Sequence, residues 1–109
     1  MKPDRCHDTH DCPVATGDHW LATWVPRIIA SRPYRAGKMA LFLVWDEDDD
    51  NHANHIPAVV VAPAVRPGTL ATGRLDHYSL LRTTEELLGL RQFLGNAAGA
   101  PSMRRAFGL

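Results

Sequence analysis

Several features are scarce in this sequence, and each shortage excludes a class of protein. No apolar run in the 109 residues approaches the ~20 residues that a membrane-spanning helix needs. Basic residues are not in excess, because 12 Lys and Arg are balanced by 12 Asp and Glu. Domains that bind nucleic acid usually carry a basic stripe. We therefore expect neither a transmembrane segment nor a nucleic-acid partner.

The first residues also lack the apolar stretch of a secretory signal. The opening M-K-P-D-R-C-H-D is charged, with no apolar run behind it, so taken literally it predicts a cytoplasmic chain. The two cysteines, Cys6 and Cys12, favour the opposite, because close cysteines often pair in exported proteins. Both observations fit a chain whose true N-terminus lies upstream.

Residues 1–16 form a polar stretch that contains both cysteines, and it is expected to be a loop held in place by some cross-link. A Cys6–Cys12 disulfide is one interpretation. A zinc site made by Cys6, His7, His10 and Cys12 is another, although structural zinc sites usually take their ligands from two separated knuckles. Two unpaired structural cysteines are the third.

The length and the 45% apolar content predict a single domain with a packed core. Its first helix is expected near residues 18–31, with Asp18 as N-cap. Pro26 falls inside this range and predicts a kink or the start of a second helix. One face of the helix is apolar and is expected to be core rather than a ligand platform: Trp20, Leu21, Trp24, Val25, Ile28 and Ile29.

Two apolar runs predict strands. Met39–Trp45 ends at five consecutive acids, residues 46–50, and Ala58–Ala62 contains three adjacent valines. Neither run alternates with polar residues, which predicts strands buried on both faces of an α/β sheet. The connection between them has no helical pattern and predicts a loop, a natural place for an active site. Its two histidines, His52 and His55, are expected to be loop residues.

A second helix is predicted over residues 77–88, capped by Asp76 and ended by Gly89. Ser79 fits the first turn of this helix. The segment beyond Gly89 is rich in small residues and is expected to wrap the surface as a tail. The predicted buried stripe of the helix consists of Leu80, Leu81, Thr84, Leu87 and Leu88.

Four motifs follow one another along the chain: H-D-T-H-D-C-x-V-A-T-G-D-x-W-L, A-L-F-L-V-W-D-E, H-I-P-A-V-V-V-A-P and L-D-H-Y-S-L-L-R-T-x-E-x-L-L-G-L. In this order they resemble the C-terminal part of the phosphoesterase family, which includes bacterial phospholipases C and acid phosphatases and belongs to the alkaline phosphatase superfamily. The resemblance implies the C-terminal segment of an α/β/α sandwich, and full-length relatives that are exported.

The resemblance also implies a metal-dependent hydrolase of phosphate esters that forms a covalent phospho-enzyme on a Ser or Thr. The acidic pair after the apolar strand, Asp46 and Glu47, matches the pair that binds the family's divalent metal ion. His10 matches a histidine near the substrate phosphate or the leaving group. His77 matches a family position of less defined role. The implied substrate is a small phosphate ester or a phospholipid head group.

The family's nucleophile and a further metal-binding pair have no counterpart in this sequence. The serines are Ser31, Ser79 and Ser102, and none lies in a motif that resembles the nucleophile. The chain is therefore expected to be a fragment with little activity of its own.

Other interpretations remain open. The alternative for Asp46 and Glu47 is a solvated acidic loop without a metal. Residues 48–50 are expected to raise the local negative potential rather than to bind the metal. A non-catalytic metal-binding or interaction module would use Cys6, His7, His10 and Cys12. Unpaired sheet edges would also permit self-association.

Overall fold

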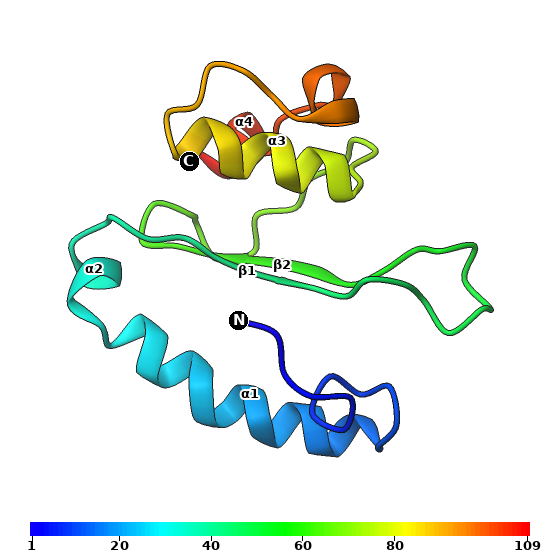
Figure 1. Ribbon diagram of the computed structural model, residues 1–109. Helices are drawn as coiled ribbons and strands as arrows, with labels where there is room; N and C mark the ends of the chain where they lie inside the picture. The colour runs from blue at the N-terminus through cyan, green and yellow to red at the C-terminus, as the bar shows by residue number, and fades with distance from the viewer. The chain divides into compact units, whose positions relative to one another are not determined.

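The computed structural model describes all residues from 1 to 109 and is an α/β chain with a two-stranded sheet. The chain divides into two compact units, residues 1–39 and residues 40–109, which are described separately. No helix combines the length and the apolar character required to cross a membrane. The helices and strands, shown in Figure 1, are α1 (Val14–Ile29), α2 (Arg32–Arg35), β1 (Leu41–Val44), β2 (Ala58–Val61), α3 (His77–Leu87), the 3-10 helix η1 (Gly95–Gly99) and α4 (Arg104–Phe107).

The first unit is a disulfide-bonded loop followed by α1. Cys6 and Cys12 form a disulfide, and α1 begins directly afterwards with Pro13 at the N-cap position. The predicted cap at Asp18 is wrong, because Asp18 lies inside the helix. The earlier start has a physical reason: Pro13 has no N–H to donate, and the first turn of a helix is where that donor is not needed.

Helix α1 runs through Pro26 and ends at Ile29, so no second helix starts at Pro26. The separate helix α2 begins at Arg32 instead, and its N-cap is Ser31, whose hydroxyl oxygen accepts the backbone N–H of Tyr34. The predicted apolar face of α1 is half-buried except at Ile29, which is exposed.

In the second unit, β1 and β2 form an antiparallel hairpin in which Leu41 pairs with Val61 and Val44 with Ala58. The strands are shorter than predicted, and the connection between them is a loop as expected. The prediction that both faces of the strands are buried is wrong, because every residue of β1 is only half-buried and Val59 in β2 is 48% exposed. A two-stranded sheet gives each strand one hydrogen-bonding neighbour, so one edge of each strand stays unpaired.

Helix α3 begins and ends where the sequence predicts. The Asp76 carboxylate accepts the backbone N–H of Ser79, while the Ser79 hydroxyl accepts the backbone N–H of Asp76. This reciprocal capping box satisfies two backbone donors at the helix start. At the other end Gly89 has a positive φ of 76°, and the N–H groups of Gly89 and Leu90 donate to the carbonyls of Glu86 and Glu85, a Schellman C-cap.

The most deeply buried residues of α3 are polar, which corrects the predicted leucine stripe. Ser79, Thr83 and Glu85 are buried, whereas Leu87 and Leu88 are exposed. Leu80 and Leu81 are half-buried, and Thr84 is exposed. The buried apolar residues of the chain are Ala62, Ala97 and Met103.

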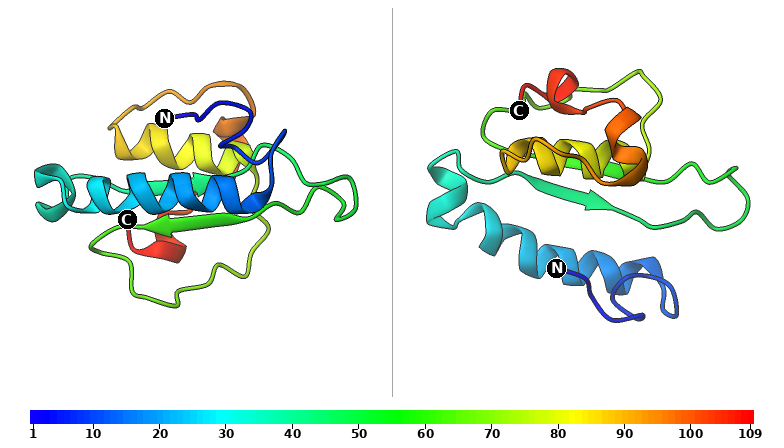
Figure 2. Two further views of the ribbon diagram at one scale, coloured as in Figure 1. Left: turned by 90° about the horizontal axis from the view of Figure 1, so that it is seen from below. Right: turned by 45° about the horizontal axis from the view of Figure 1, so that its top comes forward.

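The predicted surface tail is a strap fastened to α3 by side-chain hydrogen bonds. The Met103 N–H donates to the Thr83 hydroxyl at 2.8 Å, and the Ser102 hydroxyl donates to Glu86 at 2.7 Å. The Arg82 guanidinium donates to the carbonyls of η1 and stacks on the Phe93 ring at 3.7 Å. In Figures 1 and 2 the strap leaves the end of α3, forms η1 and returns along the helix to α4.

Candidate functional site

Two of the predicted site residues meet in the second unit. Asp46 follows β1 after Trp45, and His77 is the first residue of α3. The His77 Nε2 lies 2.9 Å from the backbone carbonyl oxygen of Asp46. Because a carbonyl oxygen can only accept, Nε2 carries the hydrogen in this pair and Nδ1 is left with its lone pair in the neutral ring. The fold thus joins the acidic end of β1 to the start of α3.

The carboxylates of Asp46 and Glu47 are exposed, and neither takes part in a side-chain hydrogen bond or ion pair of this chain. Their oxygens are therefore available to a ligand. Carboxylate oxygens suit hard divalent cations such as Mg²⁺ or Ca²⁺, which take six or more oxygen ligands. Two carboxylates fit part of such a shell, and further ligands would have to come from water, substrate or other protein residues.

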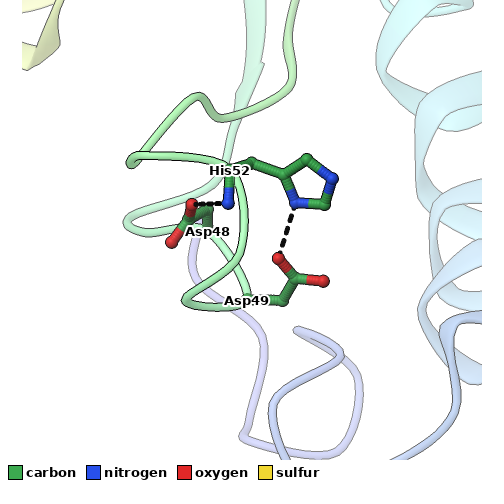
Figure 3. A group of neighbouring side chains, drawn as sticks. All are labelled: Asp48, Asp49 and His52. Carbon is green, nitrogen blue, oxygen red and sulfur yellow. Dashed lines mark hydrogen bonds and ion pairs between the residues drawn. The ribbon is translucent and has the colours of Figure 1, made fainter.

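The structure also gathers Asp48, Asp49 and His52, whose potential ligand atoms all lie within 4.8 Å of one another. Figure 3 shows the three side chains in the loop after β1. The sequence prediction gave the acids of residues 48–50 only an electrostatic role. The sequence contained one signal that could have identified this group, namely an aspartate and a histidine three residues apart in a loop, Asp49 and His52.

Hydrogen bonding within the loop already engages the Asp48 carboxylate. Its Oδ2 accepts the backbone N–H groups of His52 and Asn54, both at 2.8 Å, and its Oδ1 accepts that of Asp50 at 2.9 Å. Desolvation raises the pKa of Asp48, but these donors outweigh it and hold the pKa below its usual value. Asp48 therefore organises a loop whose backbone is left-handed at Asp50, Ala53 and Asn54.

Asp49 and His52 form a second interaction in this loop. The His52 Nδ1 lies 2.7 Å from the Asp49 Oδ1. The side-chain hydrogen bond to His52 lowers the pKa of Asp49, and the same bond raises the pKa of His52. Each partner favours the charged form of the other. Both side chains are about two-thirds exposed, so the pair is an exposed ion pair that orders the loop.

The other predicted residues lie in the first unit. The His10 Nδ1 is 2.9 Å from the Asp11 Oδ1 and 3.1 Å from the Arg5 Nη2. The His7 Nδ1 is 2.9 Å from the Asp4 carboxylate. The pKa of Asp4 is lowered mainly by the hydrogen bond from the His7 backbone N–H, and the hydrogen bond to the His7 side chain lowers it further. With both sulfur atoms in the disulfide, the cysteines offer no thiolate to a metal.

An open cavity of about 380 Å³ lies beside α1, lined by His7, Thr16, His19, Trp20, Thr23 and Trp24. The Trp20 and Trp24 ring centroids are 6.1 Å apart with the planes tilted by 44°, and the Arg27 guanidinium lies 5.1 Å from the Trp24 ring centroid. His7, a ligand in the alternative zinc interpretation, lines this cavity, whereas His10, Asp46, Glu47 and His77 do not.

Each serine hydroxyl has a structural partner. Ser31 caps α2, Ser79 is fully buried in the capping box of α3, and Ser102 donates to Glu86. All three serine hydroxyls are therefore engaged in hydrogen bonds of the local structure.

An acidic pair at the end of a strand, fastened to the start of a helix in an α/β chain, is consistent with metal-assisted hydrolysis. Residues 1–91 match the model of the Phosphoesterase family, and the chain belongs to this family. A phosphatidylinositol-3-phosphatase from Mycobacterium tuberculosis (strain ATCC 25618 / H37Rv) is 34% identical to this chain over an alignment 113 residues long, which includes 97% of this chain. The chain spans 34% of the length of that relative. No solved structure matches the chain.

Proposed function

We propose that this chain forms part of the catalytic region of a phosphoric-ester hydrolase whose substrate is a phosphorylated inositol lipid. Membership of the Phosphoesterase family supports the reaction class, and the name of the mycobacterial relative supports the substrate class. The observation that carries the proposal is the junction of Asp46 and His77. It holds two uncommitted carboxylates at a fixed place beside the first turn of α3.

In this proposal Asp46 and Glu47 hold a divalent cation through their carboxylate oxygens. When bound, such a cation polarises a phosphoryl oxygen and lowers the pKa of a coordinated nucleophile. The role of His77 is to position the pair: its Nε2–H donates to the Asp46 carbonyl and fixes the backbone that carries both carboxylates.

His10 is proposed to contact the substrate phosphate or the leaving group. Its imidazole lies between a carboxylate, Asp11, and a guanidinium, Arg5. The Arg5 guanidinium is paired with the Asp11 carboxylate at 3.0 Å, and a guanidinium can also bind phosphate oxygens through paired hydrogen bonds.

The nucleophile is proposed to come from residues outside this sequence. The structural roles of Ser31, Ser79 and Ser102 and the 34% share of the relative's length support this. We expect the 109-residue chain alone to hydrolyse phosphate esters at close to the background rate. The Cys6–Cys12 disulfide supports an oxidising compartment for the working protein.

Metal binding tests which carboxylates are the ligands. Titration of the chain with Mn²⁺ or Mg²⁺ is expected to show one site that is lost in Asp46→Asn/Glu47→Gln and kept in the matched variant Asp48→Asn/Asp49→Asn. The reverse result would assign the metal to the group of Asp48, Asp49 and His52, and equal binding by both variants would contradict any specific site.

The reaction class is tested by a chimera in which this chain replaces the matching segment of the mycobacterial phosphatase. The chimera is expected to hydrolyse a soluble phosphomonoester and a phosphoinositide. Asp46→Asn/Glu47→Gln should reduce this activity by roughly 100-fold or more, because metal ligation supplies several kcal/mol of transition-state stabilisation. An unchanged rate in that variant would contradict the proposal, as would robust metal-dependent turnover by the 109-residue chain alone.

A further inference from the structure

Four leucines are exposed around the C-terminal end of α3. Leu87 is 42% exposed, Leu88 72%, Leu90 50% and Leu94 69%. The fold holds the last two near the helix end through Glu85, because the Leu90 N–H donates to the Glu85 carbonyl and the Leu94 N–H to its carboxylate. Clustered exposed apolar side chains mark interaction surfaces more often than scattered ones do. We name Leu87, Leu88, Leu90 and Leu94 the leucine patch.

The sequence that carries this patch is basic, although the whole chain is neutral. Residues 87–109 contain three arginines and no aspartate or glutamate, and Arg91, Arg104 and Arg105 are all exposed. In Figure 1 and both views of Figure 2, the C-terminus lies at the same end of α3 as the patch.

The two nearest acids in the sequence offset this charge only in part, because Glu86 also interacts electrostatically with Arg104. Glu85 is 3% exposed, and the Glu86 carboxylate is paired with Arg82 and accepts the Ser102 hydroxyl. The surface around the leucine patch therefore combines apolar side chains with Arg91 and Arg105, which form no ion pair, and with Arg104, whose Nε donates to the Leu109 carbonyl.

We propose that the leucine patch and its three arginines dock the protein on an anionic membrane surface. Leucines enter the boundary between head groups and acyl chains, while arginines interact with negatively charged lipids. The charge favours a lipid surface over a second copy of this chain, because a self-complementary contact would bring like charges together. Docking would hold the protein at the surface that contains the proposed lipid substrate, and this use alone rests on the proposed function.

Vesicle co-sedimentation tests the docking without any substrate. The chain is expected to bind vesicles of phosphatidylcholine with phosphatidylserine, to bind pure phosphatidylcholine much less, and to be released by salt. Leu88→Ser/Leu90→Ser should weaken binding about tenfold or more, because two apolar side chains no longer enter the membrane. Arg91→Gln should weaken it about fivefold, the loss expected for one basic side chain. Leu70→Ser is the control, since Leu70 is 84% exposed and lies outside residues 87–109.

Three results would overturn the docking. They are absence of binding to anionic vesicles, equal binding by Leu88→Ser/Leu90→Ser and Leu70→Ser, or a dimer that the double variant converts to monomer while vesicle binding stays unchanged. The last result would assign the patch to a second copy. Circular dichroism and melting temperature confirm that each variant folds. The chimera's rate on a soluble phosphomonoester tests the proposed function separately, since that substrate needs no membrane.

Discussion

The His77 Nε2 lies 2.9 Å from the Asp46 carbonyl oxygen, although 31 residues separate them in the sequence. The hydrogen bond joins the first residue of the acidic loop to the first residue of α3. An exposed hydrogen bond of this kind contributes modestly to stability. It also ties the backbone at Asp46, the residue before Glu47, to the start of α3.

His77→Ala is expected to lower the free energy of unfolding by about 0.5 kcal/mol, the low end for a hydrogen bond, because the site is exposed. Amide hydrogen exchange around Asp46 and Glu47 should accelerate. His55→Ala is the matched control, because the hydrogen bond that His55 makes comes from its backbone N–H. Equal exchange rates in the two variants would show that His77 does not hold the loop.

The strap beyond α3 depends on the buried hydroxyl of Thr83, which accepts the Met103 N–H and donates to the Ser79 carbonyl. Thr83→Val keeps the shape but leaves a buried backbone donor unpaired, which should cost about 1–3 kcal/mol in urea denaturation. Thr84→Val is the control, since Thr84 is exposed and its hydroxyl contacts only its own helix. A smaller loss for Thr83→Val than for Thr84→Val would contradict this role.

Gly17 allows the disulfide-bonded loop to lie against α1. A Cβ at Gly17 would clash with the Thr9 Cγ2 and would lie 3.1 Å from the His7 carbonyl oxygen. Gly→Ala inside a helix usually stabilises by about 0.5–1 kcal/mol, but here we expect a net loss of about 1–3 kcal/mol from overpacking.

The control for this substitution is Gly73→Ala, because a Cβ at Gly73 meets nothing within 4 Å. It is expected to be neutral or slightly stabilising. Melting temperatures of the two variants decide the matter, and a gain in Gly17→Ala would show that the loop does not pack against the helix.

The Asp49–His52 pair predicts a limited pH range for loop order. The stability that ionised Asp49 gives to the folded loop is fully present above its unfolded-state pKa of 3.8. It is lost as the pH falls through the lower pKa of the folded state. The contribution of His52 is present below its unfolded-state pKa of 6.5 and is lost as the pH rises through its higher folded value. The loop should therefore be most ordered in weakly acidic solution.

NMR titration of the His52 ring measures this effect. Its midpoint should lie above 6.5 in the native sequence and fall towards 6.5 in Asp49→Asn, because the hydrogen-bonded carboxylate is removed. Asp50→Asn is the control, since the Asp50 side chain makes no bond to His52. The same midpoint in both variants would contradict the pairing.

Local rules predicted some elements of this protein well. Asp76 and Gly89 mark the ends of α3 because a capping side chain and a left-handed glycine act over a few residues. The start of α1 was misplaced because Asp18 has the residue type of a cap, whereas Pro13 and the adjacent disulfide cysteine mark the actual start.

The candidate site was predictable in part. The adjacent carboxylates of Asp46 and Glu47 follow an apolar strand in the sequence, and the family membership agrees with their predicted role without testing it. The pairing of Asp49 with His52 was missed, because turns with positive φ at Asp50, Ala53 and Asn54 bring the loop back on itself. A linear charge run does not reveal such a turn.

The sequence by itself determined the family, the main helices and strands, and the acidic pair at the end of β1, because these depend on residue order and local hydrogen bonding. Only the tertiary structure decided that His77 binds the Asp46 carbonyl, that polar side chains of α3 hold the strap, and that four leucines stay exposed. The two hydrogen-bonded contacts join residues far apart in the chain. The exposure of the leucines depends on which elements pack against that side of the helix. Helical periodicity identifies an apolar face but not its partner.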